Sequence, residues 1–487
     1  MDSLLHSIVL SPENGVVEHE RRVARDLETL NLPAANWPAH ILTPDGETVT
    51  DVLVVGAGMN GIAAAAALIF KGVRNVRILE RSSAGNEGPW LTFARMDTLR
   101  SPKTLPGPAL GIPSLSFRAW YEAAFGTDAW EALYKIENAL WVDYLRWLQR
   151  VLSLPVEHQV EVTSIVPSGR FLKVATSSPQ GANVFHARRV VLATGRGGAG
   201  GDKIPDLIDA DLWPGLAAHT NEAIDFASLA GRSVGILGGG ASAWDNAATA
   251  LERGAGRVDM YVRRHHLPQI NKGRGSASPG YFHGWAALDD AARWALFVYL
   301  NDEQAPPPHE TVRRALRQPQ FHIHFGKPVQ RATRLDGKVL VQIRGEGAPR
   351  LHDFLIVGTG FRVDAASIPE IADLTPSVAR WRDRYEPPED LQRQELGDFP
   401  YLGEGFELLE REPGSCPALS RIHLVNHGAA LSQGAIASDI PGVNVAAERV
   451  STAIVKSLFA EDIGAIRQAL EAFDEPELRD TPFFVPR

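Results

Sequence analysis

The sequence predicts an α/β protein with two doubly wound, Rossmann-like nucleotide-binding domains, the second inserted into the first. An apolar strand, a Gly-rich turn, a helix and a second strand follow one another over residues 52–80, and the same order returns over residues 233–263. This order is typical of a βαβ unit. A short apolar strand ending in Thr-Gly follows each unit, at Val190–Gly195 and at Phe354–Gly360. The repeated ending indicates that the chain leaves the first domain, builds the second and returns.

The N-terminal region precedes both units and is expected to form an extension. Glu18–Leu30 has helical spacing, and Pro33 and Pro38 would end that helix. The expected parts are the extension, the first part of the first domain, the linker with the second domain, and the return to the first domain: residues 1–48, 49–200, 201–350 and 351–487.

Composition narrows the class of protein. The chain has 487 residues, of which 44% are hydrophobic and 22% are charged, as in ordinary globular proteins. Its net charge of -9 provides no broad basic field, so we expect no nucleic-acid partner. The N-terminus has no secretory pattern, which predicts a cytoplasmic protein. The apolar run Gly61–Phe70 is too short to cross a bilayer and is expected to be a buried helix.

Cysteine content excludes one class of redox enzyme. Cys416 is the only cysteine, so no pair of thiols can pass electrons to a disulfide substrate. We expect Cys416 to be a packing residue. We also expect no metal site.

The first Gly-rich turn carries the full G-x-G-x-x-G pattern. Gly56 allows the tight turn, Gly58 lets the backbone approach a pyrophosphate, and Gly61 permits close packing of helix on strand. Glu80 ends the second strand, 19 residues after Gly61. A carboxylate at that position can accept hydrogen bonds from the two hydroxyls of a ribose. The first unit is therefore predicted to bind a dinucleotide with a free ribose.

The second Gly-rich turn fits G-x-G-x-x-A, and its predicted nucleotide-binding residues are Gly238, Gly240, Ser242 and Ala243. Arg263 and Arg264 occupy the position at which the first unit has Glu80. An arginine there can bind a 2′-phosphate, whereas a carboxylate would repel it. The second unit is therefore predicted to bind NADPH rather than NADH.

These elements together resemble the class B flavoprotein monooxygenases, over roughly residues 50–460. Trp213–His219 looks like the first part of the F-x-G-x-x-x-H signature of that group, although Ala223 stands where an aromatic residue would complete it. The resemblance implies FAD at the first unit and NADPH at the second. It further implies that NADPH reduces FAD, that dioxygen forms a flavin 4a-hydroperoxide, and that NADP⁺ shields this species from water.

The resemblance also suggests further cofactor-binding residues. Gly88-Pro89-Trp90 looks like the Gly-x-Trp segment that follows the ribose acid, which assigns Trp90 to the flavin site. The two strand ends add Thr194 and Gly195 to the first site and Thr359 and Gly360 to the second. The Asn found near the flavin in many members is not recognisable, and Arg100-Ser101-Pro102-Lys103 occupies its stretch.

Three residues are candidates for organising the reaction pocket: His219, Lys103 and Arg100. With Arg95, the last two belong to a cationic loop that the resemblance places beside the flavin, where cations would favour an anionic substrate or the reduced, anionic flavin. The alternatives are a structural histidine and a solvated basic loop. An aromatic-rich stretch follows, in which Trp141 and Tyr144 have helical spacing that predicts a buried face and leaves a substrate lid as the alternative.

The function expected from these features is hydroxylation of a small polar substrate with dioxygen, by an oxidoreductase that uses FAD and NADPH. A weaker resemblance, in length and in the region from Ser101 to Pro108, is to bacterial FAD-dependent urate hydroxylases. It suggests an anionic heterocycle such as urate. The alternatives are amine N-hydroxylation, an NADPH-dependent flavin reductase or diaphorase, and a non-catalytic sensor of nucleotide redox state. The sequence leaves the oligomeric state open.

Overall fold

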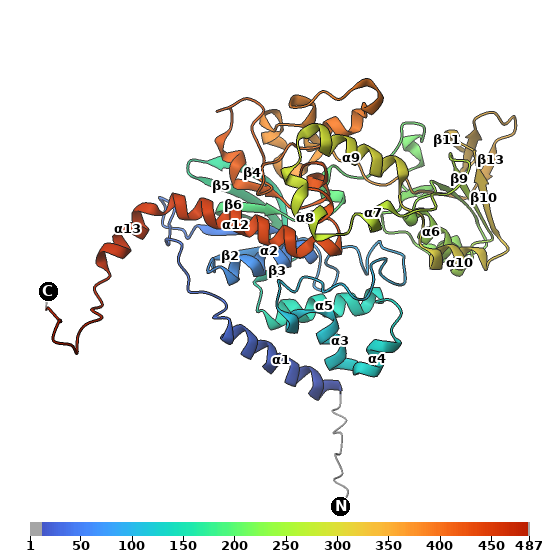
Figure 1. Cartoon of the computed structure of the whole chain (residues 1–487). Coiled ribbons are helices and arrows are strands. Elements are labelled where there is room, and N and C mark those ends of the chain that lie inside the picture. Colours follow the sequence, from blue (N-terminus) through green and yellow to red (C-terminus); the bar gives the residue numbers. More distant parts are fainter. Residues whose placement is uncertain (1–11, 486–487) are drawn as a thin grey trace, which may run out of the picture.

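The computed structural model describes residues 12–485 and contains a large, mainly parallel sheet for the first nucleotide unit (Figure 1). The order of its strands is β3-β2-β1-β6-β5-β4, with β15 paired to β6 on the other side. Strands β1, β2, β3, β6 and β15 are parallel, whereas β5 pairs antiparallel with β6, and β4 pairs antiparallel with β5. The bounds are β1 Thr50–Val55, β2 Val76–Glu80, β3 Val156–His158, β4 Glu161–Ser168, β5 Phe171–Ser178, β6 Gly181–Leu192 and β15 Ile422–Leu424.

A second parallel sheet carries the second nucleotide unit, with strand order β10-β9-β8-β14-β7. An antiparallel sheet, β11-β12-β13, lies beside it. The bounds are β7 Ala217–His219, β8 Ser233–Leu237, β9 Arg257–Val262, β10 Phe321–Phe325, β11 Val329–Leu335, β12 Lys338–Ile343, β13 Arg350–His352 and β14 Phe354–Val357. All of these strands lie between β6 and β15 in the sequence, so the second sheet is inserted into the first.

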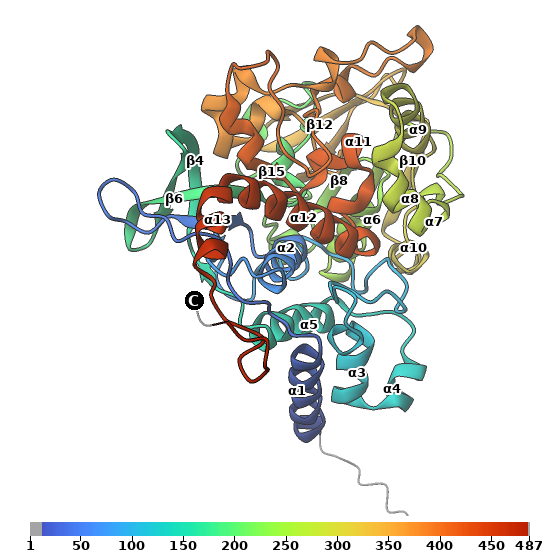
Figure 2. The same ribbon diagram turned by 60° about the vertical axis from the view of Figure 1, so that its left-hand side comes forward.

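Helices cover both sheets, as Figures 1 and 2 show from two sides. Their bounds are α1 Pro12–Thr29, α2 Met59–Phe70, α3 Phe117–Phe125, α4 Thr127–Ala132, α5 Asn138–Val151, α6 Ala241–Glu252, α7 Lys272–Gly275, α8 Pro279–Gly284, α9 Asp290–Glu303, α10 His309–Leu316, α11 Ala430–Gln433, α12 Val443–Glu461 and α13 Ile463–Ala472. Helix α2 packs against α12 and is almost entirely buried, as expected for the apolar run that starts at Gly61. Within the described residues, no helix is both long and apolar enough to cross a bilayer.

The fold class and both βαβ units are confirmed. The helix predicted within the extension is present, although α1 begins at Pro12 rather than at Glu18. Strand β6 is longer than the predicted apolar segment because its polar N-terminal half pairs with β5. The predicted aromatic face of α5 is buried, since Trp141 and Tyr144 are at most 1% exposed and pack with Phe117. The numerical domain boundaries at residues 200 and 350 stay predictions.

A buried ion cluster joins the N-terminal edge of the first sheet to the end of α12. Arg188 of β6 is 0% exposed, and its guanidinium donates to Asp51 at 3.1 Å and to Asp462 at 2.7 and 3.0 Å. Asp462 also accepts from the backbone N–H of Ala39 at 3.0 Å, which ties in the segment after α1. Burial raises the pKa of Asp51 to about 6, although Arg188 opposes that shift.

Candidate functional site

The first Gly-rich turn lies between β1 and α2, at the C-terminal edge of the first sheet. Gly56 has φ +100°, and a Cβ atom placed on it would lie 2.7 Å from the Ala193 carbonyl oxygen. A Cβ atom on Gly61 would overlap the carbonyl oxygen of Gly56. Gly58 is different, because a Cβ atom there would meet no atom within 4 Å. Gly56 and Gly61 therefore serve the turn and the packing, whereas Gly58 faces an open side next to the first turn of α2.

Glu80 ends β2 beside this turn and is only 6% exposed. Its carboxylate accepts the backbone N–H of Ala57 at 2.8 Å and that of Ser82 at 2.8 Å. An ionised carboxylate has about four lone-pair positions, so Glu80 can hold the loop and still accept from a ribose. No motif in the sequence predicts the bond to Ala57.

The return strand β15 places two further polar residues at this edge, of which Asn426 is buried and His427 is half-buried. Asn426 is 0% exposed, and its amide nitrogen donates to Thr194 Oγ1 at 3.0 Å and to the Gly198 carbonyl at 3.4 Å. Burial lowers the pKa of the adjacent His427 to about 3, and Arg196 acts in the same direction. Neither residue is among the site residues predicted from the sequence. The available signal was a polar pair directly after a predicted parallel strand, where side chains meet at the edge of the sheet.

The second Gly-rich turn has the same geometry as the first, with one difference at the contact between the helix and the neighbouring strand end. The methyl group at this contact belongs to the helix in the second unit and to the strand end in the first. Gly238 has φ +124°, and Gly240, like Gly58, has no atom within 4 Å of a placed Cβ. Ala243 occupies the position of Gly61 and is 0% exposed. A Cβ on Gly358 would lie 2.7 Å from the Cβ of Ala243. The second unit thus accommodates Ala243 because its neighbouring strand end carries Gly358 in place of alanine.

The predicted phosphate-binding arginines follow the tip of β9. Arg263 is exposed, and its side chain forms no hydrogen bond or ion pair with any residue from 12 to 485. Arg264 donates to the carbonyl of Asp302 at the end of α9, at 3.1 Å. Arg263 is consequently the more available cation at this strand tip.

His219 is predicted to organise the reaction pocket. In the structure it is buried beside the two chain segments that connect the first sheet to the second. It ends β7, is 0% exposed, and its Nδ1 lies 3.3 Å from Asp202 and accepts the backbone N–H of Asn221 at 3.2 Å. Its ring meets Phe361 edge-on, at 5.9 Å between centroids. Asp202 and Phe361 form a β-bridge between the outgoing and returning chain segments. His219 therefore packs where both connections pass.

The three cations of the loop after β2 each have a separate partner. Arg100 forms an ion pair of 2.8 Å with Asp245 of α6, which is 3% exposed. Lys103 donates to the carbonyl of Trp130 at 2.6 Å and lies over its ring. Arg95 donates to the Glu222 carbonyl at 2.8 Å. The three cations are therefore each held by a partner. Arg95 and Arg100 connect the loop to the second domain, and Lys103 connects it to α4.

The remaining predicted residues have the following surroundings. Trp90 meets Trp141 edge-on at 6.2 Å and accepts from Asn138 through its carbonyl. The hydroxyl of Thr359 donates to the Lys203 carbonyl. Ser242 is exposed in the first turn of α6. Gly195 and Gly360 have φ of +70° and +82°, so both strand ends turn in a conformation that favours glycine.

The residues present fit two dinucleotides. Each Gly-rich turn has one glycine on an open side, at Gly58 and Gly240, and each precedes a helix whose first N–H groups have no side-chain cap. Backbone N–H groups and the helix dipole at such a turn suit a pyrophosphate. The strand tips that follow carry opposite charge, Glu80 in the first unit and Arg263 in the second.

Comparison with known proteins agrees with this geometry. A family model described as pyridine nucleotide-disulphide oxidoreductase matches residues 53–277. FAD-dependent urate hydroxylase of Xanthomonas campestris pv. campestris is 38% identical over 462 residues, which cover 94% of this chain and 96% of that protein.

Solved structures show the same fold at lower identity. An ornithine hydroxylase from Pseudomonas aeruginosa has a TM-score of 0.68 and 19% identity, over 84% of this chain and 100% of its own. L-lysine 6-monooxygenase from Pseudomonas syringae has a TM-score of 0.62 and 18% identity, over 84% and 99%. The relative that matches nearly the whole sequence shows that this chain belongs to the same family of flavin-dependent monooxygenases as FAD-dependent urate hydroxylase.

Proposed function

We propose that the protein binds FAD at the turn of Gly58 and NADPH at the turn of Gly240, and hydroxylates a small anionic heterocycle, with urate as the substrate. The observation that carries the proposal is the 38% identity to FAD-dependent urate hydroxylase along almost the entire chain. The reversal of charge from Glu80 to Arg263 supports the assignment of the two cofactors.

Bound FAD supplies the redox chemistry, and the chain has to position the partners and keep water out. Glu80 and the N-terminus of α2 hold one dinucleotide, while Arg263 and the N-terminus of α6 hold the other. The ion pair between Arg100 and Asp245 fastens the loop after β2 to α6. This ion pair connects the loop beside the FAD site to α6, the helix that begins at the NADPH site.

The direct test is oxygen uptake by the purified flavoprotein with NADPH. Urate should raise both oxygen uptake and NADPH oxidation, in equal molar amounts, whereas ornithine should raise neither. Coupled turnover with ornithine instead of urate would identify an amine N-hydroxylase. NADPH oxidation that needs a quinone and consumes no oxygen would identify a reductase.

The assignment of NADPH predicts a selective effect at Arg263. Arg263→Glu should raise the KM for NADPH about tenfold or more and change that for NADH by less than about twofold, because only NADPH carries the 2′-phosphate. Steady-state rates with both coenzymes measure this. Arg253→Glu makes the same charge change at the far end of α6, where the side chain is exposed, and should leave both values unchanged. Equal increases for the two coenzymes in Arg263→Glu would contradict the assignment.

The position of His219 predicts a loss of coupling. His219→Ala opens a cavity where the two connecting segments cross, and this should loosen the alignment of the nucleotide sites. The hydrogen peroxide released per NADPH consumed should rise several-fold, while the FAD content stays unchanged. A peroxide assay during turnover with urate measures the ratio. An unchanged ratio in folded His219→Ala protein would limit this residue to packing.

A further inference from the structure

A cavity of about 530 Å³ lies between the first sheet and α12. Its position is set by Arg189 of β6, which pairs with Val52 in β1, and by Ser457 and Glu461 in the last turns of α12. The N-terminus of α12 follows the Ala437 region, which contacts Asn60 of the first Gly-rich turn. The cavity therefore lies toward the opposite edge of the sheet from the flavin site. Its size is in the range of small-molecule sites, about 300–1,000 Å³.

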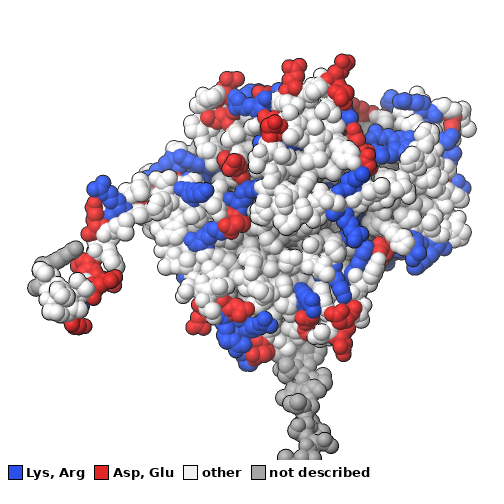
Figure 3. Space-filling view, viewed as in Figure 1, with Lys and Arg blue, Asp and Glu red and all other residues white. Residues whose placement is uncertain are grey.

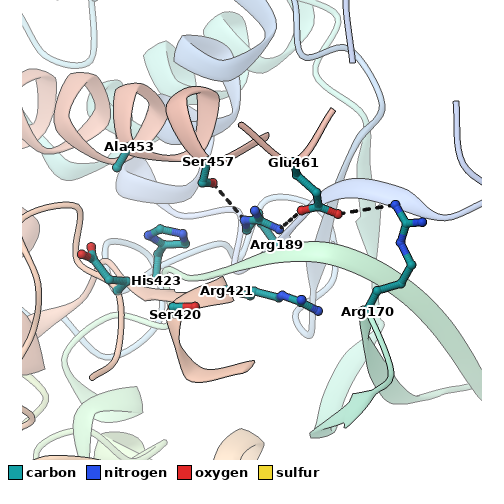
Figure 4. Close-up of a pocket in the computed structure, with 9 residues that line it drawn as sticks. Arg170, Arg189, Ser420, Arg421, His423, Ala453, Ser457 and Glu461 are labelled. Carbon is teal, nitrogen blue, oxygen red and sulfur yellow. Dashed lines mark hydrogen bonds and ion pairs between the residues drawn. The ribbon is translucent and has the colours of Figure 1, made fainter. Parts of the chain in front are cut away.

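The cavity lining is rich in guanidinium groups, which Figure 4 shows on one side of the pocket in that view. Arg189 is 5% exposed and pairs with Glu461 at 3.0 Å, while Arg170 lies 3.8 Å from the same carboxylate. Arg421 has no acidic partner within 4 Å among residues 12–485, and its buried Nη1 has no hydrogen-bond acceptor there. A buried donor without an acceptor has lost its hydrogen bonds to water and gained none in return. Arg421 is thus a cation available for an anionic group.

The other side of the cavity offers hydrogen-bond acceptors. His423 is 3% exposed, and its Nδ1 lies 2.7 Å from the carbonyl of Gly405, so Nδ1 is the protonated nitrogen. Burial lowers the pKa of His423 to about 4, which keeps the ring neutral and leaves a lone pair on Nε2. Neither this Nε2 nor Oε2 of Glu407 has a partner within the described part of the chain. Glu407 and His423 face each other across a β-bridge, so their side chains are neighbours.

The unpaired groups are complementary to a ligand that has two different ends. Arg421 requires an oxyanion, whereas His423 Nε2 and Glu407 require N–H donors. The lining holds three arginines and two glutamates with a neutral histidine, so a ligand with one net negative charge balances it. We propose that this cavity binds a small acidic amino acid, with a carboxylate on Arg421 and the ammonium group on Glu407 and His423.

Matched pairs of ligands test the proposal on the flavin-loaded protein. L-aspartate and succinate differ only by the ammonium group, as do L-glutamate and glutarate. Titration calorimetry should show that at least one amino diacid binds about tenfold or more tightly than its analogue. Arg421→Gln should weaken the binding of both members of a pair. Glu407→Gln should remove only the preference for the amino compound.

Controls separate binding from folding. Arg334→Gln changes an exposed arginine on β11 and should leave binding unchanged. Flavin content and the unfolding midpoint are measured for each variant, and Arg421→Met, which also removes the positive charge, replaces Arg421→Gln if the latter misfolds. Equal affinity for both members of each pair would overturn the amino-acid assignment. Failure of all four compounds to bind, or binding that is insensitive to Arg421, would overturn the site itself.

Discussion

Gly58→Val is expected to yield a folded protein that carries no flavin. A Cβ atom at this position meets no protein atom within 4 Å, and the backbone at φ −66° is open to any residue. The valine side chain would instead occupy the side from which the pyrophosphate approaches the N–H groups of α2. Flavin absorbance after gel filtration, together with circular dichroism, measures the result. Yellow protein with a full complement of FAD would contradict the assignment of the first site.

The second turn provides a matched control for this variant. Gly240→Val also places a side chain in open space, but at the site assigned to NADPH. It should retain FAD and lose reduction of the flavin by NADPH, while chemical reduction by dithionite remains. Gly61→Val has a different expected result, because its side chain would overlap the Gly56 carbonyl and prevent folding. Loss of flavin in both Gly58→Val and Gly240→Val would point to a general folding defect.

The sequence predicted these turns because their chemistry is local. Gly56, Gly58 and Gly61 lie within six residues, and a strand before them and a helix after them complete the pattern. Asn426 contacts Thr194, which lies 232 residues earlier in the chain, and no spacing pattern in the sequence predicts that contact. Local patterns therefore predict the nucleotide-binding turns. The residues that the return strand β15 adds to the site, such as Asn426, are identified only in the three-dimensional structure.

The cationic loop shows a different limit of sequence analysis. Arg100 and Lys103 are near one another along the chain, which predicts that they share one cationic loop. In the structure Arg100 pairs with Asp245, 145 residues away, and Lys103 turns to the carbonyl of Trp130. A charged side chain takes the nearest partner in space, and sequence proximity alone does not show which partner that is. The roles of Arg100 and Lys103 in the reaction stay predictions.

Arg188→Met is expected to lower the free energy of unfolding by about 3–5 kcal/mol. Methionine replaces the aliphatic part of the side chain but leaves Asp51 and Asp462, at most 4% exposed, without their shared cation. Chemical denaturation at neutral pH measures the loss. Arg188→Lys retains a positive charge but not the forked donors, so its loss should be smaller. A change below about 1 kcal/mol in Arg188→Met would show that water reaches these carboxylates.

The loss in Arg188→Met should depend on pH in a defined direction. Burial already raises the pKa of Asp51 to about 6 in the presence of Arg188, and removing the cation should raise it further. Protonation neutralises the unpaired carboxylate, so the difference from the parent protein should shrink as the pH falls toward about 6, below which Asp51 is protonated in both proteins. A difference that grows on acidification would contradict this electrostatic explanation.

The exchanged methyl group between the two Gly-rich turns limits how the halves of this enzyme can be recombined. In one half the methyl belongs to Ala193 and faces Gly61, and in the other it belongs to Ala243 and faces Gly358. Transplanting only the strand end of the first half into the second would bring two methyl groups together, and the reverse transplant would leave a void. Although the two halves share one topology, each helix must be transferred together with its own strand end.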